Sequence, residues 1–164
     1  MAYAFSLDDV AYLRSDAGRA ALSALADLPL TPASRLADVN RARQVSPTRF
    51  AAVLETVLLR RKSAKVGFTD GLFTSDALQQ ATAHPVAVHR ARRFTGPAHD
   101  VTCSIGADLA ALPEGSVGSD LDPVRLAMAR HNLGDAVPLV RADALRPVSR
   151  GTAVLADPAR RDSS

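Results

Sequence analysis

The segment spanning residues 99–122 constrains the fold more than any other part of the chain. It contains, in order, an extended run at 100–103, a tight turn at 104–107, a brief helix at 108–112 and a second extended run at 117–119. Two short extended runs joined through a helix are typical of neighbouring parallel strands in an α/β sheet. Because open α/β sheets bind ligands at the carboxyl ends of their strands, Asp120 falls where a ligand would lie.

Two residues of this segment are suited to contact that ligand. Gly106 lies in the turn, where the lack of a side chain lets the backbone approach a ligand closely. Asp120 follows the first run by about twenty residues, a spacing at which an acid accepts hydrogen bonds from ribose hydroxyls. The sequence therefore predicts a crevice for a nucleoside between the turn and the strand tip.

Several stretches, taken in order, give the chain a family resemblance. They are Ser-Ile-Gly-Ala-Asp at 104–108, Asp-Leu-Asp-Pro-Val-Arg-Leu-Ala-Met-Ala-Arg-His-Asn at 120–132, Arg-Ala-Asp at 141–143, Asp-Pro-Ala-Arg at 157–160, and a lead-in at 71–74 and 89–94. Their order and spacing resemble those of class I S-adenosylmethionine (SAM)-dependent methyltransferases. The likeness is closest to the trimethylguanosine-synthase-like branch and its bacterial relatives with a THUMP-like domain, and it covers residues 66–161.

The resemblance implies a cofactor site around the first turn. Ser104 to Gly106 would lie along the methionine part of SAM, and Asp100 would anchor its amino group. Asp120 would bind the ribose hydroxyls. Two plainer roles compete: Asp100 could cap a strand end, and the neighbouring Asp122 is better explained as a helix cap than as a ligand.

The resemblance also implies contacts to the adenine and to the methyl acceptor. Leu121 would cover one adenine face, and Asp143 with the backbone of Ala144 would bind the adenine amino edge. Asp157 and Pro158 would hold the acceptor near the methyl group, as the catalytic motif of the family does. Asp143 could instead be a turn residue before Leu145, and Cys103 is better explained as a small buried apolar residue than as a nucleophile.

The chain departs from the family pattern in three respects. Ser104 stands where the family has the first glycine of motif I, and Asp157-Pro158-Ala159-Arg160 lacks the second proline and the aromatic residue. Strands five to seven of such a sheet have no counterpart after the fourth. We therefore expect a truncated form of the enzyme, or an assembly in which the exposed edge of strand four pairs with another copy.

The predicted elements give an α/β fold, in which a partial Rossmann-like sheet of about four parallel strands, in order 3-2-1-4, follows an all-helical N-terminal layer. The expected divisions are a helical layer at 1–62, a linker with lead-in helices at 63–97 and a SAM-binding portion at 98–164. Helices are predicted at 7–13, 15–27, 31–43, 46–61, 75–81, 84–93 and 123–133, an extended piece at 66–68, and further strands at 137–140 and 152–156.

Charge is distributed unevenly. Residues 1–97 carry thirteen Lys and Arg against eight Asp and Glu, and residues 98–164 carry seven against nine. A basic front half favours an anionic partner such as RNA, although modest surface charge for solubility explains the same numbers. The expected RNA contacts are the densest basic positions, Arg60, Arg61, Lys62, Arg90, Arg92 and Arg93.

Composition excludes several classes of protein. Cys103 is the one cysteine, so there is no internal disulfide and no cysteine metal cluster. His84 and His89 are five residues apart and do not share a helix face, which argues against a metal site. No apolar run is long enough to span a membrane, and the first residues lack the pattern of a signal peptide, so a cytoplasmic location is expected.

These observations support two functions. The first is a SAM-dependent methyltransferase that transfers the methyl group of SAM directly to RNA. The alternative is a non-catalytic interaction or dimerisation module that keeps the SAM fold but lacks the C-terminal catalytic half. A dinucleotide-dependent enzyme is disfavoured, because a full Gly-x-Gly-x-x-Gly motif is absent.

Overall fold

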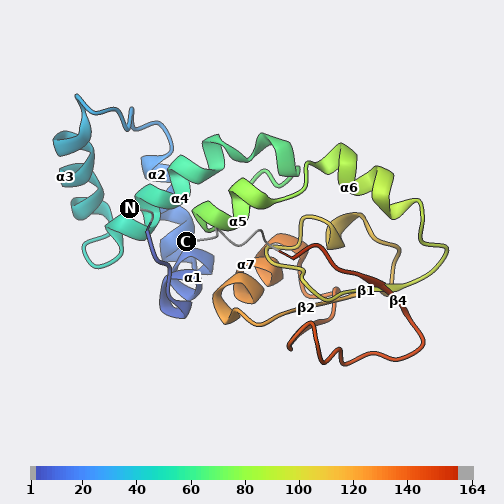
Figure 1. Cartoon of the computed structure of the whole chain (residues 1–164). Helices are drawn as coiled ribbons and strands as arrows, with labels where there is room; N and C mark the ends of the chain where they lie inside the picture. The colour runs from blue at the N-terminus through green and yellow to red at the C-terminus, as the bar shows by residue number, and fades with distance from the viewer. Residues whose placement is uncertain (1–2, 159–164) are drawn as a thin grey trace, which may run out of the picture.

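The computed structural model describes residues 3–158 and begins with a layer of helices (Figure 1). The layer consists of α1 (Leu7–Arg14), α2 (Asp16–Leu25), α3 (Arg35–Val45) and α4 (Phe50–Arg61). A 3-10 helix η1 (Ser63–Val66) and the short helices α5 (Ser75–Gln80) and α6 (His84–Ala91) lead from this layer to the sheet. The predicted helical layer and lead-in helices are confirmed.

Helix α1 begins with a capping box, in which Ser6 and Asp9 each bond the other's backbone N–H. The Asp9 N–H donates to Ser6 Oγ at 3.1 Å, and the Ser6 N–H donates to Asp9 Oδ2 at 2.9 Å. Asp9 also accepts a hydrogen bond from Arg49 Nη1 at 2.8 Å. Because Asp9 is buried, this ion pair ties the start of α1 to the residue before α4.

A four-stranded parallel sheet follows the helices. Its strands are β1 (Ala98–Asp100), β2 (Val117–Asp120), β3 (Leu139–Arg141) and β4 (Ala153–Leu155), in the order β3-β2-β1-β4. The register pairs Asp100 of β1 with Gly118 of β2 and with Leu155 of β4. This is the predicted 3-2-1-4 order, and the α/β fold with a partial Rossmann-like sheet is confirmed.

Helix α7 (Pro123–Leu133) joins β2 to β3 and has the predicted boundaries. The Asp122 carboxylate caps it by accepting hydrogen bonds from the N–H groups of Val124 and Arg125, at 2.8 and 3.2 Å. Gly134 ends the helix with a φ of +76°. Pro138 precedes β3, where its missing N–H breaks no ladder hydrogen bond, as expected.

One hydrophobic core joins the helical layer to the sheet. Leu13, Leu25 and Val53 from the helices belong to the same buried cluster as Ile105 and Met128 from the sheet half. Helix α7 supplies the link, since it packs against α1 on one side and against β2 and β3 on the other (Figure 1). The bend after β1 is therefore held between both halves of the molecule.

Two helices predicted to begin at a Ser-Pro or Thr-Pro pair begin later than expected. Helix α3 starts at Arg35, because Thr31 and Ser34 hydrogen-bond to each other through side chains and backbone and close a separate turn. Helix α4 likewise starts at Phe50, after a turn. The extended piece predicted at 66–68 is also wrong, because η1 continues to Val66 and the next residue, Gly67, has left-handed backbone with a φ of +77°.

The first strand lies earlier than predicted. We expected residues 100–103 to be extended, but β1 ends at Asp100. The Thr102 N–H donates to Asp100 Oδ1 at 3.1 Å, a local side-chain contact that turns the backbone immediately after the strand. A short 3-10 helix, η2 (Leu109–Ala111), replaces the brief helix expected at 108–112.

Candidate functional site

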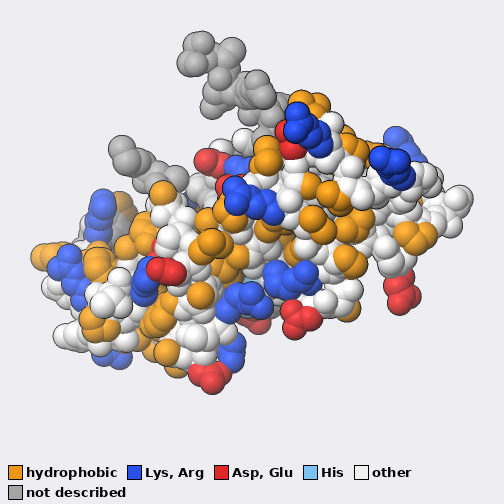
Figure 2. All heavy atoms as spheres, turned by 90° about the horizontal axis from the view of Figure 1, so that it is seen from below, with side chains coloured by type: hydrophobic (Ala, Val, Ile, Leu, Met, Phe, Trp, Pro, Cys, Tyr) orange, Lys and Arg blue, Asp and Glu red, His pale blue; other side chains and the backbone are white. Residues whose placement is uncertain are grey.

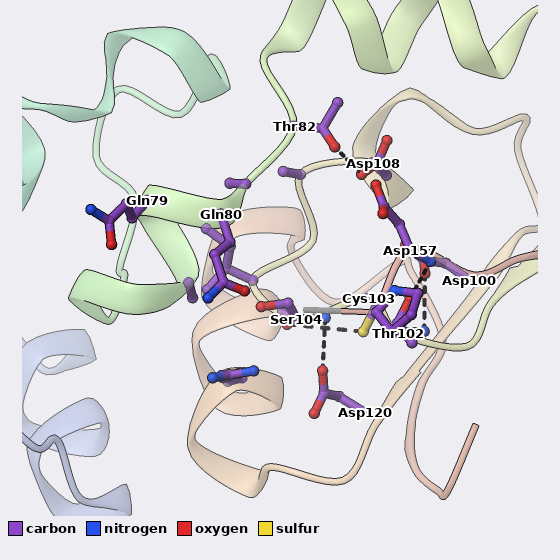
Figure 3. Close-up of a pocket in the computed structure, with 16 residues that line it drawn as sticks. Gln79, Gln80, Thr82, Asp100, Thr102, Cys103, Ser104, Asp108, Asp120 and Asp157 are labelled. Atoms are coloured by element: carbon purple, nitrogen blue, oxygen red, sulfur yellow. Dashed lines mark hydrogen bonds between the residues drawn. The ribbon is translucent and has the colours of Figure 1, made fainter. Parts of the chain in front are cut away.

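A cavity of about 650 Å³ opens at the carboxyl ends of β1, β2 and β4, beside α5 (Figure 3). This volume lies within the range of small-molecule binding pockets. Its position is the one that open α/β sheets use for ligands. The residues around it come from the lead-in helices, the bend after β1, the tip of β2, the start of α7 and the segment after β4.

Asp120 at the tip of β2 contacts the bend directly. The Ser104 N–H donates to Asp120 Oδ2 at 3.0 Å (Figure 3). The Asp122 N–H donates to Asp120 Oδ1 at 2.9 Å. The expected closeness of strand tip and turn is therefore present. Each carboxylate oxygen has a second lone pair, so Asp120 keeps acceptor capacity for a ligand in the cavity.

The bend uses left-handed backbone at two positions. Ser104 has a φ of +49°, a conformation that residues with a side chain adopt only at a cost, and Gly106 has a φ of +89°. A Cβ on Gly106 would lie 2.7 Å from Leu133 Cδ1. The missing side chain thus makes room for Leu133 of α7, and Gly106 is not among the residues that line the cavity.

Asp100 forms part of the cavity wall at the end of β1 and is 2% exposed. Its Oδ1 accepts the Thr102 N–H, while Oδ2 has no hydrogen bond among the described residues. Burial raises the pKa of Asp100 to about 7, against the lowering effect of the Thr102 hydrogen bond, and the charges of Asp108, Asp120 and Asp157 raise it further. Near neutral pH, Asp100 therefore exists in both protonation states.

Arg90 of α6 holds two acids on another part of the cavity wall. Its Nη1 lies 3.2 Å from Asp108 Oδ1 and 2.8 Å from Asp157 Oδ2. The Thr82 hydroxyl donates to Asp108 Oδ2 at 2.6 Å, and the Asp157 N–H donates to Thr102 Oγ1 at 2.9 Å. These contacts fix Asp157, the predicted acceptor-binding residue, on the cavity wall.

The predicted site residues fall into two groups. Those that line the cavity are Asp100, Ser104, Asp120, Asp157 and Pro158. Those that do not are Gly106, Leu121, Asp143 and Ala144. Asp143 Oδ1 accepts the Leu145 N–H at 3.0 Å, which is the turn role named as its alternative. Ala159 and Arg160 of the expected motif lie outside the described residues.

The cavity also contains residues that sequence analysis did not assign to it. Asp108 lies close behind the bend and served only as the expected start of a helix, and Arg125 lies in the first turn of α7. Gln79, Gln80 and Thr82 come from α5 and the residues after it (Figure 3). No local pattern identifies these five residues, because they reach the cavity through the packing of α5 and α7 on the bend.

Comparison with known proteins finds one domain family and two curated relatives. A domain family of unknown function, DUF8688, matches residues 6–63. Proteins from two strains of Mycobacterium tuberculosis, each named an uncharacterized S-adenosylmethionine-dependent methyltransferase, are 56% identical to the chain over 126 residues. The chain is a homologue of these proteins. The match covers 68% of this chain and 35% of each relative, so the chain spans about a third of their length. No solved structure matches the chain significantly.

The six basic residues expected to contact RNA differ in their surroundings. The three with partners in the protein are Arg60, which donates to backbone carbonyls of residues 70 and 71, Arg61, which donates to carbonyls of residues 26, 28 and 29, and Arg90. The side chains of Lys62, Arg92 and Arg93 are exposed and have no such contact among the described residues. On the face shown in Figure 2, Lys and Arg side chains are dispersed among apolar ones.

Other kinds of site have less support. The Cys103 thiol is buried, and burial raises its pKa well above the ordinary range, so it is a poor nucleophile near neutral pH. His99 is buried in the sheet, where Ser119 and Ser149 hydrogen-bond its two ring nitrogens. Among residues 3–158, no group of three His, Cys, Asp or Glu is arranged to hold a metal ion, and no helix is long and apolar enough to cross a membrane.

Proposed function

We propose that the chain binds SAM in the cavity beside Asp120 and forms the cofactor-binding part of a methyltransferase. The observation that carries the proposal is the contact between Asp120 and the Ser104 N–H, which places an acid and a bend together at the carboxyl end of a parallel sheet. The homology to proteins named SAM-dependent methyltransferases supports the same cofactor.

The charges around the cavity fit SAM, which carries a sulfonium and an amino group. Asp120 would accept hydrogen bonds from the ribose hydroxyls through its remaining lone pairs. Asp100 would bind the amino group through Oδ2, which has no protein partner among the described residues. An ammonium group beside Asp100 favours its ionised form, so the raised pKa of Asp100 would fall on binding.

SAM supplies an electrophilic methyl group, so the protein's task is to orient the acceptor and exclude water. Asp157 is the candidate for orienting the acceptor, because Arg90 and Thr102 hold it on the cavity wall. Its carboxylate would accept a hydrogen bond from an amino or hydroxyl group of the acceptor. No side chain needs to form a covalent bond.

RNA is the acceptor that we propose, with Lys62, Arg92 and Arg93 as its phosphate contacts. Their side chains are exposed and make no hydrogen bond or ion pair within the described part of the protein. Incubation with tritium-labelled SAM and total RNA, DNA or protein in parallel tests this proposal. We expect label in RNA, and label confined to DNA or protein would contradict it. Membership of the THUMP-like branch stays a prediction.

Calorimetry with SAM tests the cofactor proposal. Substitution Asp120→Asn removes a charged acceptor with little change of shape, and we expect it to weaken SAM binding by about 10- to 100-fold. Asp135→Asn is the matched control, because Asp135 is exposed and does not line the cavity. Absence of binding by the folded wild-type protein would refute the proposal, and equal affinity of the Asp120→Asn variant would refute the role of Asp120.

A second function is favoured by the edge of the sheet. Strand β4 pairs with β1 on one side only, and its Val154 is 51% exposed. An exposed apolar edge strand pairs readily with another chain. We therefore propose, as the alternative, an interaction module that associates with a second copy through β4.

A further inference from the structure

Arg125 differs in charge from the other ionisable residues that line the cavity. Among the described residues, the cavity is lined by four carboxylates, those of Asp100, Asp108, Asp120 and Asp157, and by one cation, Arg125. Arg125 lies in the first turn of α7, which follows the tip of β2. A ligand in this cavity therefore meets one positive group in otherwise acidic surroundings.

Part of the Arg125 guanidinium is buried without a hydrogen bond. Its Nε is buried and has no hydrogen-bond partner among the described residues, and it forms only a long ion pair with Asp122 Oδ2, at 3.6 Å. No other hydrogen bond to this side chain is found among the described residues. Buried polar groups in native proteins nearly always have a partner, so this donor needs an explanation.

Other arginines with similar exposure are satisfied within the protein. The Arg125 side chain is 28% exposed, and that of Arg90, at 29%, binds two carboxylates. Arg49 and Arg60 are similarly covered, and each donates to a carboxylate or to backbone carbonyls at normal distances. Arg125 therefore differs from the other partly covered arginines, which donate to acceptors within the protein.

We propose that Arg125 is the oxyanion-binding residue of the cavity. The planar guanidinium offers parallel donors that match a carboxylate or a phosphate. The oxyanion can come from the carboxylate of SAM, in which case the inference rests on the proposed function, or from a phosphate of the acceptor. With SAM, Asp100 and Arg125 would bind the amino and carboxylate groups of one zwitterion.

A comparison of two ligands and two proteins tests the carboxylate source. Decarboxylated SAM keeps the amino group, sulfonium and nucleoside but lacks the carboxylate. We expect wild-type protein to bind it about tenfold or more weakly than SAM, and Arg125→Gln to bind both ligands with equal affinity. Arg125→Lys keeps the charge without the planar fork and should show an intermediate preference.

Inorganic phosphate tests the other source without requiring SAM. Titration of phosphate into the unliganded protein, followed by NMR, should shift amide signals of the bend and of α7 in wild type and not in Arg125→Gln. Arg41→Gln is the matched control for both arms, since it removes the same charge from an exposed position on α3, away from the cavity. Thermal unfolding of each variant confirms that it is folded.

The outcomes separate this inference from the proposed function. A carboxylate preference lost in Arg125→Gln supports the first source, and a phosphate response lost in the same variant supports the second. If SAM binds but neither preference depends on Arg125, the inference is wrong while the proposed function stands. If SAM does not bind the folded wild type, the proposed function fails, and the phosphate arm alone decides the role of Arg125.

Discussion

Ionisation of the Asp100 carboxylate costs free energy, because the group is buried and surrounded by other acids. Asp100 is buried at the end of β1. The acids at positions 108, 120 and 157 raise its pKa from the residue before η2, the end of β2 and the segment after β4. Arg90 offsets part of this charge through Asp108 and Asp157. A buried acid among like charges is typical of binding sites, because a cationic ligand then gains from ionising it.

Asp100→Asn should stabilise the protein at high pH. The pKa of Asp100 is about 7 in the folded protein against 3.8 as the reference, so its protonated form is favoured by folding. The wild-type stability that depends on Asp100 is complete below the lower value and is lost as pH rises through the higher one. The neutral asparagine avoids this loss, and urea unfolding should show the variant gaining about 3–4 kcal/mol on wild type between pH 4 and pH 8.

Asp100→Asn also removes the carboxylate that we propose binds the amino group of SAM. Calorimetry should therefore show weaker SAM binding by the more stable variant. A stability difference that does not change with pH would show that Asp100 is ionised with an ordinary pKa in the folded protein.

The variants Gly106→Ala and Gly134→Ala, compared with each other, separate the conformational cost of an alanine from its steric cost. Both glycines have positive φ, +89° and +76°, a conformation that costs an alanine about 1–3 kcal/mol. Only at Gly106 would the new Cβ also meet Leu133, whereas nothing lies within 4 Å at Gly134. Thermal or urea unfolding should show a larger loss for Gly106→Ala, by about 1–3 kcal/mol. Equal losses would mean that Leu133 moves aside freely.

At the scale of elements, a helix or strand boundary was predictable where residues close to it in the sequence determine it. The boundaries of α7 were predicted correctly because Asp122, Pro123 and Gly134 act within a turn of the helix ends. The end of β1 was missed because one side-chain contact, from Thr102 to Asp100, decides it. The place of Arg125 in the cavity depends on residues far away in sequence, so it could not be predicted from spacing.

Asn132 of α7 connects three segments through one amide. Its Oδ1 accepts the Leu72 N–H at 2.8 Å, and its Nδ2 donates to the carbonyls of Leu72 and Ile105 at 3.1 and 2.9 Å. Asn132→Asp removes both donors and sets a charge against two carbonyls, so unfolding free energy should fall by about 2 kcal/mol or more.

The control for this variant is Asn40→Asp, which introduces the same charge on the exposed side of α3. It should unfold within about 0.5 kcal/mol of wild type. Because Ile105 follows Ser104 in the bend, SAM affinity should fall with Asn132→Asp and not with the control. Unchanged stability would show that the lead-in to α5 is held by its apolar contacts alone.

At the scale of the whole molecule, the strand order and the position of the cavity followed from the sequence. Alternating strand and helix signals predict a parallel sheet, and a parallel sheet places the ends of β1, β2 and β4 together. The helices before the sheet were predicted, but the part of the wall formed by α5 and the two residues after it was not, because it depends on how α5 packs above the sheet. Asp120 was therefore placed correctly, while Asp108, Gln80 and Arg125 were missed.

The exposed edge of β4 makes a prediction about association. Val154→Lys places a charge on the edge strand, which opposes pairing with a second copy. If the chain associates through β4, sedimentation velocity should show wild-type dimers and Val154→Lys monomers. Val148→Lys is the matched control, since Val148 is 56% exposed in the loop before β4. Monomeric wild type across the accessible concentration range would contradict association.

The bridge made by Asn132 also bears on the order of events during synthesis. Leu72 leaves the ribosome 60 residues before Asn132, which must hydrogen-bond to it. The helical layer can collapse early, but its loop before α5 gains its amide partner only once most of the chain has been translated. The segment before α5 is therefore fixed in place late, when α7 docks between the two halves.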